Sequence, residues 1–203
     1  MQTTADIDDG RNDFDFLVGR WTIRHRRLNA RLAGCRDWTE FDGTCAMQKT
    51  MQGLGNMDDN TVDLPEGAYA AVGVRRFDPA LRRWSIWWLD ARYSDIEPPV
   101  HGGFAHGVGE FIGDDVFQGK PVKVRFRWSA ITATTAEWRQ AFSQDGGATW
   151  ETNWEMWFTR AGQGHLSLSP RPQRSGEPGP SFGFTHREWD LIWVPDRPDG
   201  RPG

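Results

Sequence analysis

The fold begins where the periodicity of the chain changes, in the stretch Asp13-Phe14-Asp15-Phe16-Leu17-Val18-Gly19-Arg20-Trp21-Thr22-Ile23-Arg24-His25-Arg26-Arg27-Leu28. Phe14, Leu17 and Val18 recur at i, i+3 and i+4, the spacing of one face of a helical turn. Beyond Gly19, apolar and polar residues alternate with a period of two, as in a half-buried strand. The stretch therefore predicts a short helical lid followed by the first strand of a sheet.

Further alternating segments follow along the chain, at a spacing of about ten residues. They cover 38–47, 69–77, 83–91, 101–105, 108–117, 122–128, 137–142 and 150–158. A third, irregular strand is expected to end near Leu64, after a turn-rich acidic segment at 53–60. About ten sequential antiparallel strands expose edges unless the sheet closes on itself. The sequence thus predicts an all-β fold, an antiparallel up-and-down β-barrel with room for a ligand inside.

A resemblance to a known superfamily supports this prediction. Gly19-Arg20-Trp21 follows the predicted helix, and two further runs, Trp38-Thr39-Glu40-Phe41-Asp42-Gly43-Thr44 and Ile86-Trp87-Trp88-Leu89-Asp90, carry the likeness. In these features the chain resembles the calycin superfamily of lipocalins, fatty-acid-binding proteins and nitrobindin-like proteins, and within it a bacterial branch with no assigned function. The resemblance covers about residues 12–160 and implies a calycin-like barrel domain, placed at 1–160, with an internal cavity.

The nitrobindin-like members of that superfamily raise the question of haem, which they hold through one histidine. Their glycine-rich opening motif is absent here, because Gly19-Arg20-Trp21 is followed by Thr-Ile-Arg, and the last predicted barrel strand has no histidine. Haem is therefore disfavoured, and no other cofactor is expected.

One loop carries a recognisable hairpin signature. Ser143-Gln144-Asp145-Gly146-Gly147-Ala148-Thr149-Trp150 matches every fixed position of the Asp-box, Ser-x-Asp-x-Gly-x-Thr-Trp, which is familiar from sialidase propellers. In this motif the Asp and hydroxyl side chains bind loop amides, glycine adopts positive φ, and the Trp packs beneath the loop. A sialidase needs several copies and an arginine cluster, so one copy predicts a hairpin rather than a glycosidase.

The composition changes after the barrel region. Residues 161–180 are rich in Pro, Gly, Ser and Arg, which predicts a linker, whereas 182–194 are too apolar for a solvated tail. Residues 161–203 are therefore interpreted as a linker and an irregular, aromatic C-terminal extension. The aromatic segment is expected to dock on the barrel or on a second subunit, which would make a homodimer.

Composition also limits the partners. The chain of 203 residues has a net charge of −4 and 12 tryptophans, so a nucleic acid partner is not expected. No secretory signal is recognisable and no window approaches a membrane span, which predicts a soluble, cytoplasmic protein without a membrane partner. Cys35 and Cys45 are assigned to one extended strand, too far apart for a disulfide, so both are expected to be reduced.

Common catalytic signatures are missing from the sequence. It contains no Gly-x-Ser-x-Gly, His-Glu-x-x-His or Cys-x-x-Cys motif and no Gly-x-x-x-x-Gly-Lys-Ser/Thr loop. Asp58-Asp59-Asn60 and Asp114-Asp115 lack the spaced oxygen ligands of a calcium loop, so turn chemistry is preferred and no metal site is predicted.

His25 is the best single candidate for chemistry. If Trp21 and Ile23 face the interior, the period of two turns His25 and Arg27 inward as well. An imidazole in a partly dry aromatic cavity can act as acid, base or ligand donor near neutral pH. The alternative is a structural histidine bonded to a neighbouring strand.

Two carboxylates complete the candidate catalytic set of His25, Glu40 and Asp90. Glu40 shares a strand face with Trp38, and Asp90 shares one with Trp88, so burial beside an indole would raise their pKa values. The alternative for either is a structural ion pair or a solvated face. The predicted ligand contacts are Trp21, Trp38, Trp88, Arg75, Trp128 and Trp138.

These residues support one preferred function and three alternatives. The preferred one is binding of a small apolar or aromatic molecule inside the barrel. A cofactor-independent isomerase, cyclase or hydrolase in the same cavity is the first alternative, and two titratable groups converging on the pocket would favour it. A haem-binding barrel and an oligomer-forming interaction protein are the others.

Overall fold

The computed structural model describes residues 9–162, and this part of the chain forms ten strands and two short 3-10 helices. The helices are η1 (Asp15–Leu17) and η2 (Met51–Gly53). The strands are β1 (Gly19–Leu28), β2 (Trp38–Thr50), β3 (Gly55–Leu64), β4 (Gly67–Asp78), β5 (Arg83–Asp90), β6 (Val100–Ala105), β7 (Val108–Phe117), β8 (Lys120–Ser129), β9 (Thr135–Ser143) and β10 (Glu151–Arg160). The C-terminal extension assigned to 161–203 lies, beyond residue 162, outside the described residues.

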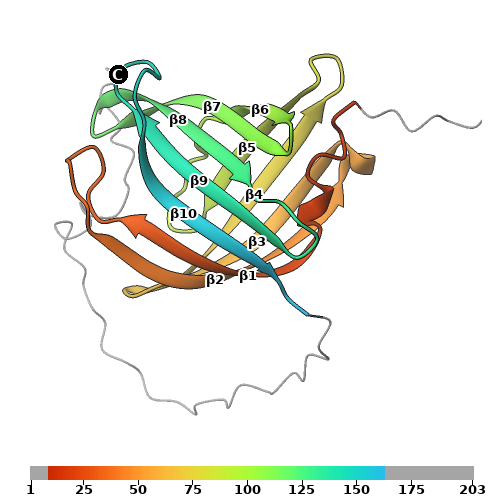
Figure 1. Ribbon diagram of the computed structural model, residues 1–203, viewed down its shortest axis with the longest axis horizontal. Coiled ribbons are helices and arrows are strands. Elements are labelled where there is room, and N and C mark those ends of the chain that lie inside the picture. The colour runs from red at the N-terminus through yellow and green to blue at the C-terminus, as the bar shows by residue number, and fades with distance from the viewer. Residues whose placement is uncertain (1–8, 163–203) are drawn as a thin grey trace, which may run out of the picture.

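All ten strands pair with their sequence neighbours, and β1 pairs with β10 to close the barrel (Figure 1). The closing pair is antiparallel from Trp21 opposite Arg160 to Arg27 opposite Trp154. Closure removes the free edges that a ten-stranded open sheet would expose. The predicted antiparallel up-and-down barrel with a short N-terminal helix is therefore confirmed.

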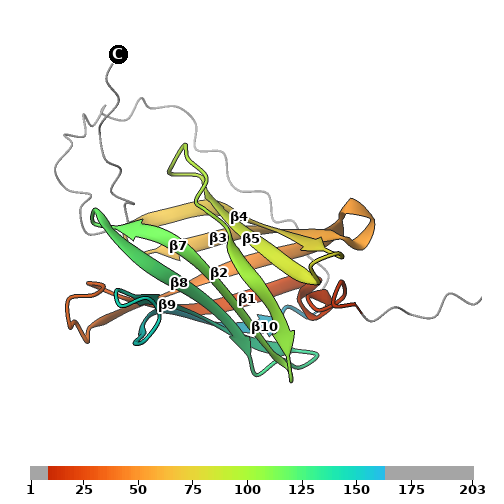
Figure 2. The ribbon, with the colours of Figure 1, turned by 90° about the horizontal axis from the view of Figure 1, so that it is seen from above.

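The two ends of the barrel differ. Residues 9–18, including η1, cover one end, which we call the lid end, and the β1–β2 and β9–β10 loops lie at the opposite, loop end (Figures 1 and 2). Arg160 fixes the lid, because its guanidinium donates to the carbonyl oxygens of Phe16 and Val18 at 2.6 and 2.7 Å. The same group lies 4.2 Å from the ring of Trp21.

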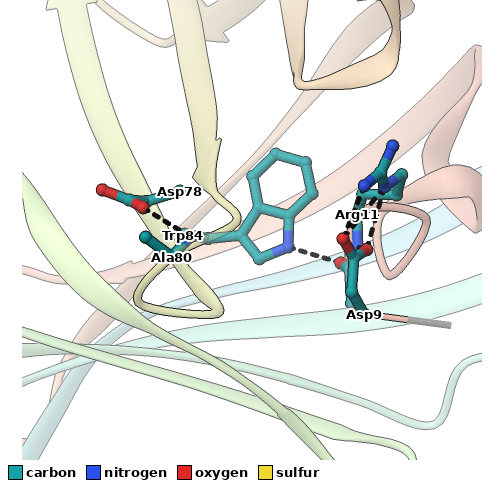
Figure 3. A network of polar contacts seen from close by, with 6 residues as sticks. Asp9, Arg11, Asp78, Ala80 and Trp84 are labelled. Atoms are coloured by element: carbon teal, nitrogen blue, oxygen red, sulfur yellow. Dashed lines mark hydrogen bonds and ion pairs between the residues drawn. The ribbon is translucent and has the colours of Figure 1, made fainter. Parts of the chain in front are cut away.

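Trp84 of β5 anchors the lid end from inside the barrel. Its indole packs edge-on against Phe14 at 5.0 Å and against Phe77 at 5.3 Å. Its Nε1 donates to the carbonyl oxygen of Gly10 at 2.9 Å, beside the ion pair of Asp9 and Arg11 (Figure 3). The lid end is therefore a closed aromatic core.

Two sequence-based expectations about the fold need correction. Residues 55–60 are not a turn but the first half of β3, a regular strand in continuous register with both β2 and β4. Cys35 lies in the β1–β2 loop rather than on a strand with Cys45, although both thiols are free. The acidic composition suggested a turn, whereas the inward side chains of β3 find their polar partners on β4.

The Asp-box loop between β9 and β10 forms as the motif predicts. Asp145 accepts hydrogen bonds from the amide and the hydroxyl of Thr149 at 2.9 and 2.5 Å. Ser143 Oγ accepts from the Gly147 amide at 2.8 Å, and Trp150 Nε1 donates to the Gly147 carbonyl at 2.9 Å. Gly147 has φ +103°, a region that favours glycine. The motif is a hairpin loop at the loop end of the barrel.

Candidate functional site

A cavity lies inside the barrel between the lid end and the loop end. Its lining is largely apolar, and aromatic side chains from β5, β8, β9 and β10 supply much of the wall. These side chains are Trp88, Phe126, Trp128, Trp138, Trp154 and Phe158. Four arginines and three carboxyl groups also line the cavity. A largely apolar wall with polar groups set into it is typical of a small-molecule site.

His25 lines the cavity and is held there as a hydrogen-bond acceptor. Its ring is 1% exposed, stacks on Phe41 at 4.8 Å, and accepts a hydrogen bond at Nδ1 from Trp154 Nε1 at 3.2 Å. Burial lowers the pKa of His25 to about 3, so the imidazole is neutral and its proton is on Nε2. Neither ring nitrogen contacts a carboxylate or a second base within residues 9–162.

The environment of His25 does not fit haem ligation. Nε2 has no hydrogen-bond partner in the described chain, but it faces the backbone of β2, where a Cβ on Gly43 would lie only 2.6 Å away. An axial ligand needs open space beyond the coordinating nitrogen. Within the described residues, no cluster of three or more His, Cys, Asp or Glu side chains is placed to hold a metal ion either.

A buried ion pair lies on the β3–β4 side of the cavity. Asp58 and Arg75 approach to 2.6 Å with side chains only 4% and 7% exposed. Asp58 also accepts from the Gly73 amide and from Asn60 Nδ2, both at 2.8 Å, and Arg75 donates to Asn56 Oδ1 at 3.1 Å. The pair is thus satisfied largely by protein groups, and only Arg75 Nε lacks a partner in the described chain.

A cluster of cations surrounds Tyr69 near the loop end. Arg92 lies 3.6 Å from the Tyr69 ring and is paired with Asp90 at 2.7 Å. Arg27 and Arg31 also line the cavity, and neither forms an ion pair with a carboxylate in residues 9–162. Burial, with the neighbouring Arg27, lowers the pKa of Arg31 to about 9, and burial raises the pKa of Tyr69 to about 12. The cluster carries more positive charge than its neighbouring carboxylates balance.

Glu97, in the β5–β6 loop, faces the same region. Burial, followed by repulsion from Asp115 and Asp90, raises the pKa of Glu97 from 4.5 to about 8, although Arg31 opposes the shift. Only three residue pairs join β5 to β6, so the two strands separate beyond Ile86, and Glu97 lines the cavity beyond that point. Glu97 is therefore largely protonated at neutral pH.

The shift of Glu97 predicts an unusual dependence of stability on pH. Between pH 4.5 and about 8, the folded protein keeps a proton on Glu97 that the unfolded chain has released, so stability falls as the pH rises. Glu97→Gln stays neutral and is expected to raise the melting temperature at about pH 8 while changing it little at about pH 4.5. Thermal unfolding of both proteins across this range measures the difference, and a lower melting temperature for the variant at the upper end would contradict the assignment.

The structure places six of the nine sequence-predicted site residues on the cavity and three elsewhere. On the cavity lie His25, Asp90, Trp88, Arg75, Trp128 and Trp138. Trp21 is buried at the lid end, where its Nε1 donates to the Leu17 carbonyl at 2.8 Å. The inward orientation expected for Trp38 and Glu40 is wrong: Trp38 packs outside under Arg26 at 4.7 Å, and Glu40 is exposed and paired with Arg24. The inward positions of β2 are those of Phe41, Gly43 and Cys45.

Sequence reasoning missed several polar residues of the cavity. Asp58 was assigned to a turn, while Arg31, Tyr69 and Glu97 were given no role. Tyr69 could have been found, because it begins a segment whose alternation places it with Ala71 and Arg75. Arg31 and Glu97 come from loops, and no periodic pattern indicates where a loop side chain points.

Comparisons with known proteins find only a distant likeness to solved structures. No protein-family model matches the chain, and no curated protein matches it. Among solved structures, a de novo designed fluorescence-activating β-barrel is 12% identical with a TM-score of 0.41, the match covering 74% of this chain and 98% of that one. An S-type phycobiliprotein lyase from Guillardia theta is 12% identical with a TM-score of 0.48, the match covering 77% of this chain and 97% of that one.

No helix in the described residues is both long and apolar enough to span a membrane. The strand pairing of this chain defines the ten-stranded antiparallel barrel, and its cavity is the basis for inferring a function.

Proposed function

We propose that this protein is a calycin-like barrel that binds a small aromatic molecule in its interior. The observation that carries the proposal is the composition of the cavity wall, where four tryptophans and two phenylalanines from β5, β8, β9 and β10 surround one enclosed space. Flat rings offer large apolar contact areas and favourable edge-on or offset packing to an aromatic guest.

The arrangement of polar groups favours binding over acid–base catalysis by a pair of groups: Glu97 lines the cavity with a pKa of about 8, but the other candidates on the cavity, His25 and Asp90, are held in structural contacts. A proton-transfer site needs a group whose pKa lies near the operating pH and which reaches the substrate. His25 has a strongly lowered pKa, and its Nδ1 is engaged by Trp154. Asp90 is engaged by Arg92 through two hydrogen bonds at 2.9 and 2.7 Å. These groups hold the site in shape and orient a guest.

Trp88 provides the most direct test of the cavity as a binding site. It is half-buried and lines the cavity, so part of its indole is free to contact a guest. We expect Trp88→Ala to weaken binding of 2-naphthamide, a small neutral aromatic probe, by about tenfold because a stacking surface is lost. Isothermal titration calorimetry of wild-type and variant proteins measures the change.

Trp38 supplies the matched control, because it is also a half-buried tryptophan but packs on the outer surface of the barrel. Trp38→Ala is expected to leave the affinity for 2-naphthamide within about twofold of wild type. Equal losses in the two variants, or no saturable binding by the wild-type protein, would refute an internal aromatic site.

A further inference from the structure

Several buried polar atoms of the cavity-lining residues lack a hydrogen-bond partner in the described chain. Besides His25, whose Nε2 faces the β2 backbone, four of the lining residues have a buried side-chain donor group without a hydrogen-bond partner in the described chain. These groups are Arg31 Nε, Tyr69 Oη, Arg75 Nε and Trp128 Nε1. A buried donor left unpaired costs free energy, so a cavity of this kind is completed by a guest or by water that supplies acceptors.

Arg31 is the most informative of these groups. It is 8% exposed, it comes from the β1–β2 loop, and its guanidinium carbon lies 5.8 Å from the Phe142 ring. The loop is held in place by the backbone amide of Leu32, which donates to Glu151 Oε1 at 2.6 Å. The arginine is thus placed by a fixed loop and forms no ion pair within residues 9–162. Glu97 is close enough to interact with it electrostatically, but the raised pKa of Glu97, about 8, keeps that carboxyl group largely protonated at neutral pH.

Arg27 extends this positive region toward the centre of the cavity. It follows His25 on the inward face of β1, and its guanidinium carbon lies 5.7 Å from the rings of Phe41 and Trp154. Of the three arginines near Tyr69, Arg27 and Arg31 therefore line one aromatic cavity without an ion pair, whereas Arg92 is neutralised by Asp90. Repulsion between Arg27 and Arg31 is relieved when an anion lies between them.

We infer that the guest is an aromatic anion whose negatively charged group is bound by Arg27, Arg31 and the hydroxyl of Tyr69, with its ring against the tryptophan wall. The inference rests on the proposed function and specifies its ligand class. A carboxylate suits the site chemically, because a planar guanidinium can donate two parallel hydrogen bonds to it. The Tyr69 hydroxyl, protonated because burial raises its pKa to about 12, donates a further hydrogen bond.

The test compares 2-naphthoate with 2-naphthamide, two guests of the same shape that differ in charge. We expect the wild-type protein to bind 2-naphthoate about 10- to 100-fold more tightly in calorimetry at neutral pH and low salt, as charge-assisted hydrogen bonds require. Added sodium chloride should weaken the binding of 2-naphthoate more than that of 2-naphthamide.

Arg31→Met keeps an unbranched side chain, shorter than that of arginine, and removes the charge. It is expected to abolish most of the preference for 2-naphthoate, so that the affinities for 2-naphthoate and 2-naphthamide become similar. Arg24→Met is the control, because Arg24 is an exposed arginine on the outward face of β1, paired with Glu40, and its loss should leave the preference intact.

The outcomes separate this inference from the proposed function. Equal binding of the two probes, or a preference that survives Arg31→Met, overturns the anion site but leaves an aromatic-binding barrel. Absence of binding by either probe overturns both.

Discussion

Replacing Asp58 with alanine is expected to lower the free energy of unfolding by about 3–5 kcal/mol, because it leaves the cation of Arg75 buried without its counter-ion. The same substitution removes the acceptor of the Gly73 amide and of the Asn60 side chain. Urea denaturation monitored by tryptophan fluorescence measures the loss, since Trp21, Trp84 and Trp128 are buried in the core.

Burial, rather than the ion-pair distance, decides the size of this effect. Asp114 and Lys123 also approach to 2.6 Å, but the Asp114 side chain is 82% exposed. Asp114→Ala is therefore expected to cost less than about 1 kcal/mol, because solvent screens the pair. Comparable losses for Asp58→Ala and Asp114→Ala would contradict the buried pair.

A double substitution tests the origin of the loss. In Asp58→Leu/Arg75→Met both charges are absent, so no ion is left unpaired in the barrel. The double variant is expected to be more stable than Asp58→Ala alone. If it is equally unstable, packing and not charge accounts for the effect.

Replacing Trp84 with alanine is expected to be the other strongly destabilising change, also by about 3–5 kcal/mol, because it opens a large cavity in the lid end. The indole is 1% exposed, packs against Phe14 and Phe77, and holds the Gly10 carbonyl (Figure 3). Chemical denaturation gives the loss directly, and Trp84→Phe, which retains much of the packing, should recover more than half of it.

Trp87 gives the matched control on the same strand. It is half-buried and lies three residues after Trp84, on the opposite face of β5. Trp87→Ala is expected to cost clearly less than Trp84→Ala, because less apolar surface is buried there. Equal losses would show that the lid end is not a packed core.

The sequence alone determined the architecture and part of the cavity. Alternation along successive segments predicted the strands and their antiparallel order, since the period of two follows from backbone geometry. The same alternation predicted that His25 and Arg27 face inward if Trp21 is buried, and the structure places both on the cavity. The Asp-box also predicted its hairpin, because all the hydrogen bonds of this motif are local.

Only the tertiary structure decided which face of a mixed strand is inside and which loops reach the cavity. Trp38 and Glu40 alternate as regularly as Phe41 and Gly43, but the β1 neighbours of Phe41 and Gly43 are the buried His25 and Ile23. Asp58 is tolerated inside because β4 brings Arg75 beside it, 17 residues along the chain. Periodicity is a property of the local backbone, whereas the burial of a charge depends on partners that only the closed barrel brings together.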